Sequence, residues 1–151
     1  MTTNDDLLAS LQELYSGQYW ALLGIETTAA GAAGATCRVR LEPKHFNYNG
    51  VVHGGVISGL IDSTAGAAVR SIRKPDEIAA RPHATSDLHV TYLAPASGEE
   101  LIAHGRVLRR GRTAIFTEVD VFDVRDGQER QVARGTVTFV IAPAPPVRPE
   151  E

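Results

Sequence analysis

The chain has 151 residues, a length that fits one domain built around one hydrophobic core. Apolar residues make up 43% and charged residues 22%, as in an ordinary soluble globular protein. The net charge is −3 and no block of Lys or Arg stands out, which argues against nucleic acid or an anionic membrane as a partner.

The cysteine, histidine and N-terminal patterns favour a cytoplasmic protein without a metal. Cys37 is the only cysteine, which excludes an intrachain disulfide and is compatible with a reducing compartment. None of the five histidines has a Cys or another His at a metal-ligand spacing, so we expect no metal site. The N-terminus lacks a basic segment and an apolar core, unlike a secretory signal. The longest apolar run, residues 51–72, carries Asp62, His53, Arg70 and four glycines, so we do not expect it to span a membrane.

The first part of the chain predicts a helix followed by a strand. Apolar residues recur at helical spacing over residues 6–23, and Asn4 or Asp5 is a candidate N-cap. The Ala/Gly stretch of residues 29–35 is expected to be flexible. Apolar and polar side chains alternate over residues 36–41, which predicts a strand with one face in the core.

After a loop over residues 43–52, the apolar segment of residues 51–73 predicts the long central helix of the fold. Its apolar face consists of Ile57, Leu60, Ile61, Thr64, Ala65, Ala68 and Ile72. The opposite side collects Gly55, Gly59, Asp62 and Gly66. Glycine inside a helix costs about 1 kcal/mol relative to alanine, and close approach of a backbone or a ligand is the usual reason for it. We therefore expect a helix buried nearly all round, with a small-residue groove that contains one acid.

Four strand candidates follow the helix: residues 87–93, 100–108, 114–124 and 131–141. Asp126 and Gly127 supply a hairpin turn, and Gly111 lies in the preceding turn. In the last strand one face is apolar and the other is more polar and faces solvent. A long buried helix with mainly antiparallel strands after it predicts an α+β fold in which the sheet curls around the helix.

The chain divides into three parts. Residues 1–22 form an N-terminal helical segment, and residues 23–141 form the α+β domain. Residues 142–151 contain four prolines and end in two acids, so we expect a disordered tail.

The chemistry-bearing segment runs from Asn47 to Asp62 and reads N-x-x-G-x-x-H-G-G-x6-D. Its glycines, Gly54 and Gly55, and His53 stand where the loop becomes the helix. Backbone N–H groups at a helix N-terminus are unpaired and carry partial positive charge, and glycines leave them open to a carbonyl oxygen. Asp62 lies more than two turns further along, and a carboxylate in largely apolar surroundings is a stronger base than one in water.

These residues resemble the motif of the hotdog-fold thioesterases of the PaaI type, relatives of bacterial phenylacetyl-CoA thioesterases. The likeness covers nearly the whole chain; it rests on the Asn47-to-Asp62 motif and is supported by residues 85–95 and 111–113. The resemblance implies a hotdog fold for residues 23–141, in which a curled antiparallel sheet wraps around a long central helix. It also implies hydrolysis of an acyl-CoA, with an aromatic or medium-chain acyl group, to the free acid and CoA, without any cofactor.

The resemblance implies a role for each matching residue. Asp62 would orient or deprotonate the attacking water, or attack the thioester directly. The Gly54 N–H would polarise the thioester carbonyl, and Asn47 and His53 would position the carbonyl, the water or the leaving thiol. Thr85 would hold the nucleophilic water.

Further implied features concern the alignment, the CoA moiety and assembly. If the alignment with the family is shifted by one residue, Ser86 takes the place of Thr85 as the residue that holds the water. The candidates for substrate binding are Gly55, Arg109, Arg110, Arg112 and Thr113, with the arginines gripping the CoA phosphates. In this family the helix of one subunit faces the loop of its partner, which implies a homodimer with shared sites and often a dimer of dimers.

Several of these residues also have a purely structural interpretation. His53 would equally cap the helix, Asn47 would close a turn, Thr85 would be an ordinary strand residue and Asp62 an exposed helix residue. The glycines would serve tight packing, and the arginines would form a solvated loop. No functional role is expected for Cys37, interpreted as buried packing, or for His45, His83, His89 and His104, interpreted as surface or strand residues.

Two other functions are compatible with the same fold. Hydratases of this fold pair the acid with a His a few residues on in the helix, whereas Ala67 stands five residues after Asp62 and no His follows in the helix. A non-catalytic acyl-CoA-binding module would not need a buried acid. Turnover of a thioester, as opposed to mere retention, distinguishes an enzyme from such a module.

Overall fold

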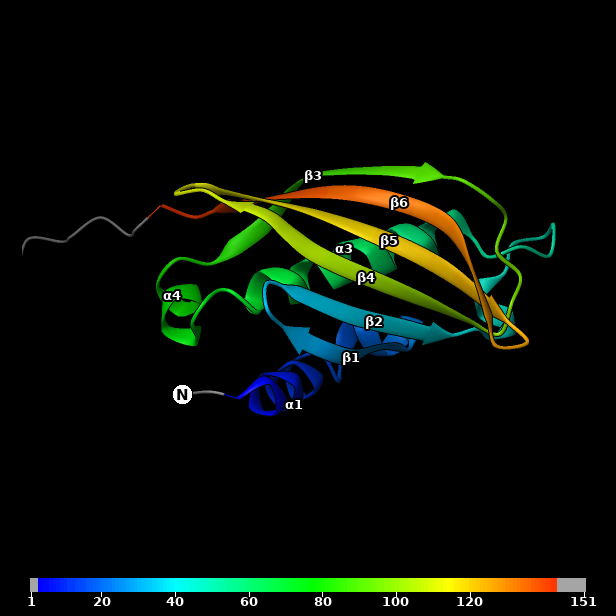
Figure 1. Ribbon diagram of the computed structural model, residues 1–151, viewed down its shortest axis with the longest axis horizontal. Helices are drawn as coiled ribbons and strands as arrows, with labels where there is room; N and C mark the ends of the chain where they lie inside the picture. The colour runs from blue at the N-terminus through cyan, green and yellow to red at the C-terminus, as the bar shows by residue number, and fades with distance from the viewer. Residues whose placement is uncertain (1–2, 144–151) are drawn as a thin grey trace, which may run out of the picture.

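The computed structural model describes residues 3–143 and has one six-stranded antiparallel sheet in the order β1-β2-β4-β5-β6-β3 (Figure 1). The strands are β1 Ile25–Gly31, β2 Gly34–Arg40, β3 His83–Tyr92, β4 Glu100–Arg110, β5 Ala114–Arg125 and β6 Gln128–Ile141. The helices are α1 Asn4–Leu14, α2 Gln18–Leu23, α3 Gly54–Arg70 and α4 Pro75–Ala80, with a 3-10 turn at Pro43–His45. The predicted α+β hotdog fold is confirmed: the curled sheet packs against the long helix α3.

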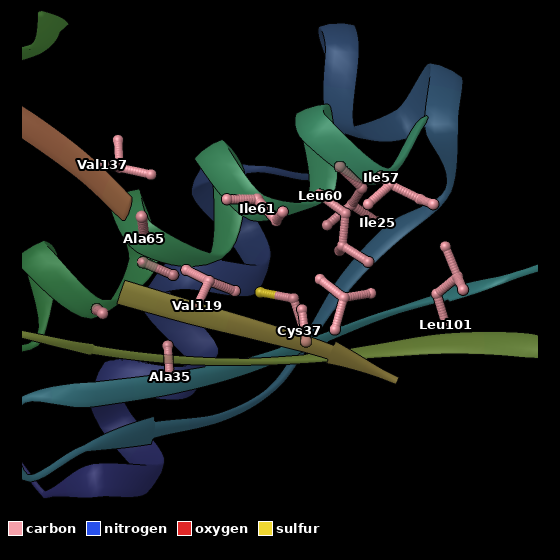
Figure 2. Close-up of a cluster of buried hydrophobic side chains, with 14 of the residues drawn as sticks. Ile25, Ala35, Cys37, Ile57, Leu60, Ile61, Ala65, Leu101, Val119 and Val137 are labelled. Atoms are coloured by element: carbon pink, nitrogen blue, oxygen red, sulfur yellow. The ribbon is translucent and has the colours of Figure 1, made fainter. Parts of the chain in front are cut away.

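The apolar face of α3 forms the centre of the core, as its sequence pattern predicts. Leu60, Ile61 and Ala65 have no exposed surface, whereas Ile72 beyond the end of the helix is only half-buried. Figure 2 gathers these three side chains with core residues of the sheet: Cys37 of β2, Val119 of β5 and Val137 of β6. The predicted packing role of Cys37 is confirmed, and burial raises the pKa of its thiol to about 11.

The small-residue side of α3 is covered differently from the prediction. A Cβ on Gly59 would meet the side chains of Tyr19 and Leu23 of α2, so side chains and not a backbone make the close approach there. Gly55 is exposed and Gly66 is partly exposed, with only Phe139 near its missing Cβ, at 4.0 Å. The helix is therefore open along part of this side, where Asp62 also lies half-buried.

The N-terminal region differs from the single helix predicted over residues 6–23. The chain breaks into α1 and α2, because Gly17 before α2 is extended and Gln18, the first residue of α2, has a left-handed φ of 59°. The N-cap of α1 is Thr3 and not Asn4 or Asp5: the Thr3 hydroxyl accepts from the Asp6 N–H, and the Asp6 carboxylate accepts from the Thr3 N–H. Leu11 is buried in the common core, so α1 packs onto the sheet.

Two elements were not predicted. Strand β1 and the hairpin to β2 occupy much of the stretch expected to be flexible, with Ala32 and Ala33 at φ 49° and 64° forming the turn. Alanine rarely adopts positive φ, so this turn has no sequence signal. Helix α4 has Pro75 in its first turn, a position that suits proline's fixed φ. The start of the predicted tail is hydrogen-bonded to the domain: the Ala142 N–H donates to the Pro82 carbonyl, and the Ala142 carbonyl accepts from Arg81. The rest of the predicted tail, residues 144–151, lies outside the described residues.

We predict that Gly135→Ala destabilises the protein. A Cβ at Gly135 of β6 would lie 2.6 Å from Cγ2 of Ile61 and 3.2 Å from the His89 carbonyl oxygen. Ile61 is fully buried and cannot move aside, so overpacking should cost about 1–3 kcal/mol. Urea unfolding at fixed protein concentration measures this cost. Gly66→Ala is the matched control: it adds a helical Cβ at an ordinary contact distance of 4.0 Å from Phe139 and should not destabilise. Equal midpoints for Gly135→Ala and the wild type would contradict the close-packing argument.

Candidate active site

Helix α3 begins at Gly54 and is capped by His53. The His53 Nδ1 accepts a hydrogen bond from the Gly55 N–H at 2.8 Å, and His53 itself has extended φ and ψ of −60° and 134°. Because Nδ1 is the acceptor, the ring proton of neutral His53 lies on Nε2, on an exposed side chain. His53 therefore caps the helix, which is the structural role expected from the sequence as an alternative to a catalytic one.

The loop before the helix is held by Asn47 and His45. The Asn47 Oδ1 accepts from the N–H groups of Asn49 and Val51, so this oxygen closes the turn, while its Nδ2 has no hydrogen-bond partner among residues 3–143. His45 is buried and not a surface or strand residue as expected. Its Nδ1 accepts from the Glu42 N–H and its Nε2 donates to the Leu23 carbonyl, both at 2.9 Å. The His45 carbonyl in turn accepts from the His53 N–H at 2.8 Å.

One backbone donor at the start of α3 is left free. The Gly55 N–H is taken by His53, but the Gly54 N–H has no hydrogen-bond partner in the described part of the chain. Gly54 and Gly55 border a cavity of about 490 Å³ whose other walls are mainly apolar and include Ile57, Tyr92 and Leu93. The cavity thus combines an unpaired N–H at a helix N-terminus with apolar walls, which suits a carbonyl compound with an apolar group.

The acid of the motif meets a hydroxyl from the sheet. The Thr85 Oγ1 donates to Asp62 Oδ1 at 2.7 Å. A β-bulge in β3 at Ser86 interrupts the register with β6, and the Ser86 hydroxyl donates instead to the Thr138 carbonyl at 3.1 Å. The structure therefore pairs the acid with Thr85 and not with Ser86.

Within one chain the acid and the free N–H lie far apart. Asp62 is eight residues after Gly54 in the same helix, which corresponds to about 12 Å along the axis. No single thioester group can contact both. The predicted catalytic residues therefore form two half-sites: Gly54, Asn47 and His53 at the helix start, and Asp62 with Thr85 further along.

The arginines of the β4–β5 turn are not brought to either half-site in this chain. Arg110 donates to the Ile72 carbonyl and to both carboxylate oxygens of Glu77, and this hydrogen bond lowers the pKa of Glu77. Arg109 and Arg112 are exposed, with no side-chain bond among the described residues. Thr113 is exposed at the same turn, and its carbonyl accepts from the Ile141 N–H.

A histidine close to Thr85 has an unusual environment. Arg73, itself buried, donates from Nη1 to His83 Nδ1 at 2.9 Å, and the His83 ring packs edge-on against Phe139. Burial, with the nearby charges of Arg70 and Arg73, lowers the pKa of His83 to about 4. His83 is therefore neutral at physiological pH.

Other parts of the described chain offer no competing chemistry. A cavity of about 610 Å³ lies between the N-terminal helices and β1, with the stacked Tyr15 and Trp20 at its wall, but none of the predicted site residues lines it. Over residues 3–143, no three His, Cys, Asp or Glu side chains are grouped to hold a metal ion. Over the same residues, no helix has the length and apolarity to cross a membrane.

Comparison with known proteins identifies the family of this chain. The sequence model of the thioesterase superfamily matches residues 49–129. Human acyl-coenzyme A thioesterase 13 is 30% identical over 119 residues, which cover 78% of this chain and 80% of the relative. A conserved protein of Pseudomonas aeruginosa has a similar structure, with a TM-score of 0.76 and 29% identity over 86% of this chain and 98% of that one. A thioesterase family protein from Silicibacter pomeroyi shares the fold, with a TM-score of 0.81 at 23% identity over 90% of this chain and 98% of that one.

We predict that His53→Ala lowers the free energy of unfolding by about 1 kcal/mol, because the Gly55 N–H loses its capping acceptor. His53→Asn should restore most of this loss, since Asn is among the best N-cap residues. Denaturant midpoints of the three proteins measure the effect. Identical midpoints for the Ala and Asn variants would mean that the cap contributes nothing to stability.

Proposed function

As a member of the thioesterase superfamily the chain is a thioester hydrolase, and we propose that it cleaves an acyl-CoA with an aromatic or medium-chain acyl group to the free acid and CoA. The observation that carries the proposal is the pairing of Asp62 with the Thr85 hydroxyl, together with an apolar cavity bordered by Gly54, whose N–H is free. The apolar walls around Gly54 suit an acyl group without charge.

The first half-site would polarise the substrate. A thioester carbonyl oxygen would accept from the Gly54 N–H, where the partial positive charge of the helix N-terminus favours the oxyanion that forms on attack. Glycine at position 54 keeps this approach open. The free Nδ2 of Asn47 and the exposed Nε2–H of His53 would be further donors near the helix start.

The second half-site would activate the nucleophile. The Thr85 hydroxyl donates to Asp62 Oδ1, so its lone pairs remain to accept from a water molecule. Asp62 would take a proton from that water while the water oxygen attacks the carbonyl carbon. When the carbon–sulfur bond breaks, the proton passes from Asp62 to the leaving thiolate, which balances the reaction. Direct attack by the Asp62 carboxylate, with an anhydride hydrolysed by water, is the alternative course of the same chemistry.

A complete site would require two chains. Strand β3 is one edge of the sheet, and it exposes Leu88 and Tyr92 with Leu93 directly after them, an arrangement that a monomer normally avoids. A second copy paired antiparallel about the middle of β3 would set Thr85 opposite the partner's Val90, two residues before the Tyr92 that contacts Gly54. We propose that Asp62 and Thr85 of one chain act with Gly54 of the other in a homodimer, with a dimer of dimers as the expected assembly.

We predict that Asp62→Asn reduces hydrolysis at least ~100-fold, because the base or nucleophile is removed without a change of shape. A panel of acyl-CoA substrates with a free-thiol reagent measures the released CoA. Cys37 should not disturb this assay, because its thiol is fully buried and its pKa is raised to about 11. Asp76→Asn, an exposed acid of α4, is the control and should keep the wild-type rate. A folded Asp62→Asn protein with near wild-type turnover would remove Asp62 from the mechanism.

We predict that two inactive variants complement each other. Asp62→Asn damages one half-site and Gly54→Val the other, since a side chain at Gly54 blocks the carbonyl and also presses on the Tyr92 ring, 3.2 Å from a Cβ. Co-expressed chains that exchange should regain activity through one intact composite site per heterodimer. Light scattering should show no stable monomer at micromolar concentration. A monodisperse active monomer would contradict both the assembly and the shared site.

A further inference from the structure

The peptide unit between Gly54 and Gly55 is held at both of its polar ends. Its N–H donates to His53 Nδ1 at 2.8 Å, and its carbonyl oxygen accepts from the Tyr92 hydroxyl at 2.9 Å. The preceding peptide unit, which carries the free Gly54 N–H, is held only on its carbonyl side, where the His53 oxygen accepts from the Val56 N–H at 2.9 Å. The direction of the free N–H is thus fixed by the bonds of its neighbours.

Tyr92 connects this helix start to the sheet. It is the last residue of β3, where it pairs with Ala133 of β6, and the following Leu93 N–H donates to the Val132 carbonyl at 2.8 Å. Its ring lies against Gly54, since a Cβ there would be 3.2 Å from both Cζ and Oη of the tyrosine. The tyrosine hydroxyl therefore transmits the rigid position of the sheet to the first turn of α3.

Two consecutive glycines at a helix start need such an external hold. Glycine has the largest backbone freedom of all residues, and helix ends fray because their first N–H groups lack intrahelical partners. An oxyanion donor is effective only when it is already aimed at the developing charge, because reorientation during the reaction costs rate. In the helical ladder the Gly54 carbonyl also accepts from the Ser58 N–H, and the Tyr92 hydroxyl adds to this ladder a hydrogen bond that comes from the sheet.

We propose that Tyr92 is a positioning residue for the reaction: its hydroxyl aims the Gly54 N–H at the thioester carbonyl by holding the Gly54–Gly55 peptide. The inference rests on the proposed function and adds to it a residue from the end of β3. Tyr92 acts through Gly54 and takes no part in proton transfer.

The first test concerns the free protein and needs no substrate. Tyr92→Phe keeps the ring against Gly54 and removes only the hydrogen bond. Backbone 15N order parameters of Gly54 and Gly55 should fall from about 0.85, typical of rigid backbone, toward about 0.6. Thr28→Val is the control, because it also removes a hydroxyl-to-carbonyl bond, to Thr36 on the β1–β2 edge, away from α3. Unchanged order parameters in Tyr92→Phe would overturn the clamp.

The second test separates positioning from folding and from substrate binding. In Tyr92→Phe we expect kcat to fall about 10-fold while KM stays within about twofold, since the lost aim affects the transition state more than the bound substrate. A 13C-labelled ketone analogue of the best acyl-CoA should show a smaller downfield carbonyl shift in the variant than in the wild type, at an equal melting temperature. Wild-type kcat and carbonyl shift in the variant would overturn the positioning role. A wild-type protein that releases no CoA would instead refute the proposed function, and the order parameters would still decide the clamp.

Discussion

The burial of α3 against the sheet is the constraint on which the other features depend. The helix comes so close to the strands that glycines replace side chains beneath it: Gly105 faces Thr64 and Gly135 faces Ile61. With Leu60, Ile61 and Ala65 completely covered, the helix can neither slide nor turn without opening voids. The groups in the middle of α3 therefore have a fixed height and direction relative to the strands. That fixed placement lets Thr85, from a strand, meet Asp62, from the helix, at 2.7 Å.

The same rigid helix also separates the two kinds of group that thioester hydrolysis needs. A free N–H is available only at a helix start, because further along the N–H groups bond to carbonyls of the preceding turn. The acid stands two turns inside, half-buried, where it accepts from the Thr85 hydroxyl. In the proposed function this separation is resolved by the edge strand β3, which carries Thr85 near one end and Tyr92 at the other. One strand would thus serve both half-sites of its own chain, which belong to two different composite sites of the dimer.

Sequence reasoning succeeded where a physical signal extends over many residues. The period of α3, the alternation in β6 and the register from Asn47 to Asp62 each predicted an element or a motif without the structure. It missed features that depend on a single long-range contact. Strand β1 was hidden because its alanines carry little strand signal and its turn places Ala32 and Ala33 at positive φ. The burial of His45 and the bond from Tyr92 to Gly54 join segments far apart in the chain, so no local pattern could indicate them. For Thr85 the sequence left two positions open, and the bulge at Ser86 decides between them.

The burial of His83 beside Arg70 and Arg73 lowers its pKa and has a consequence for stability in acid. An unfolded chain would protonate His83 as the pH falls through about its ordinary value of 6.5, whereas the folded chain resists protonation down to about 4. Between these values the unfolded state binds the extra proton, so the folded state loses stability as the pH falls through this window and gains it as the pH rises. Above this window the ring is neutral in both states and contributes no pH dependence. His83 stands two residues before Thr85, so the strand that presents the hydroxyl to Asp62 carries a group that favours the unfolded state in mild acid.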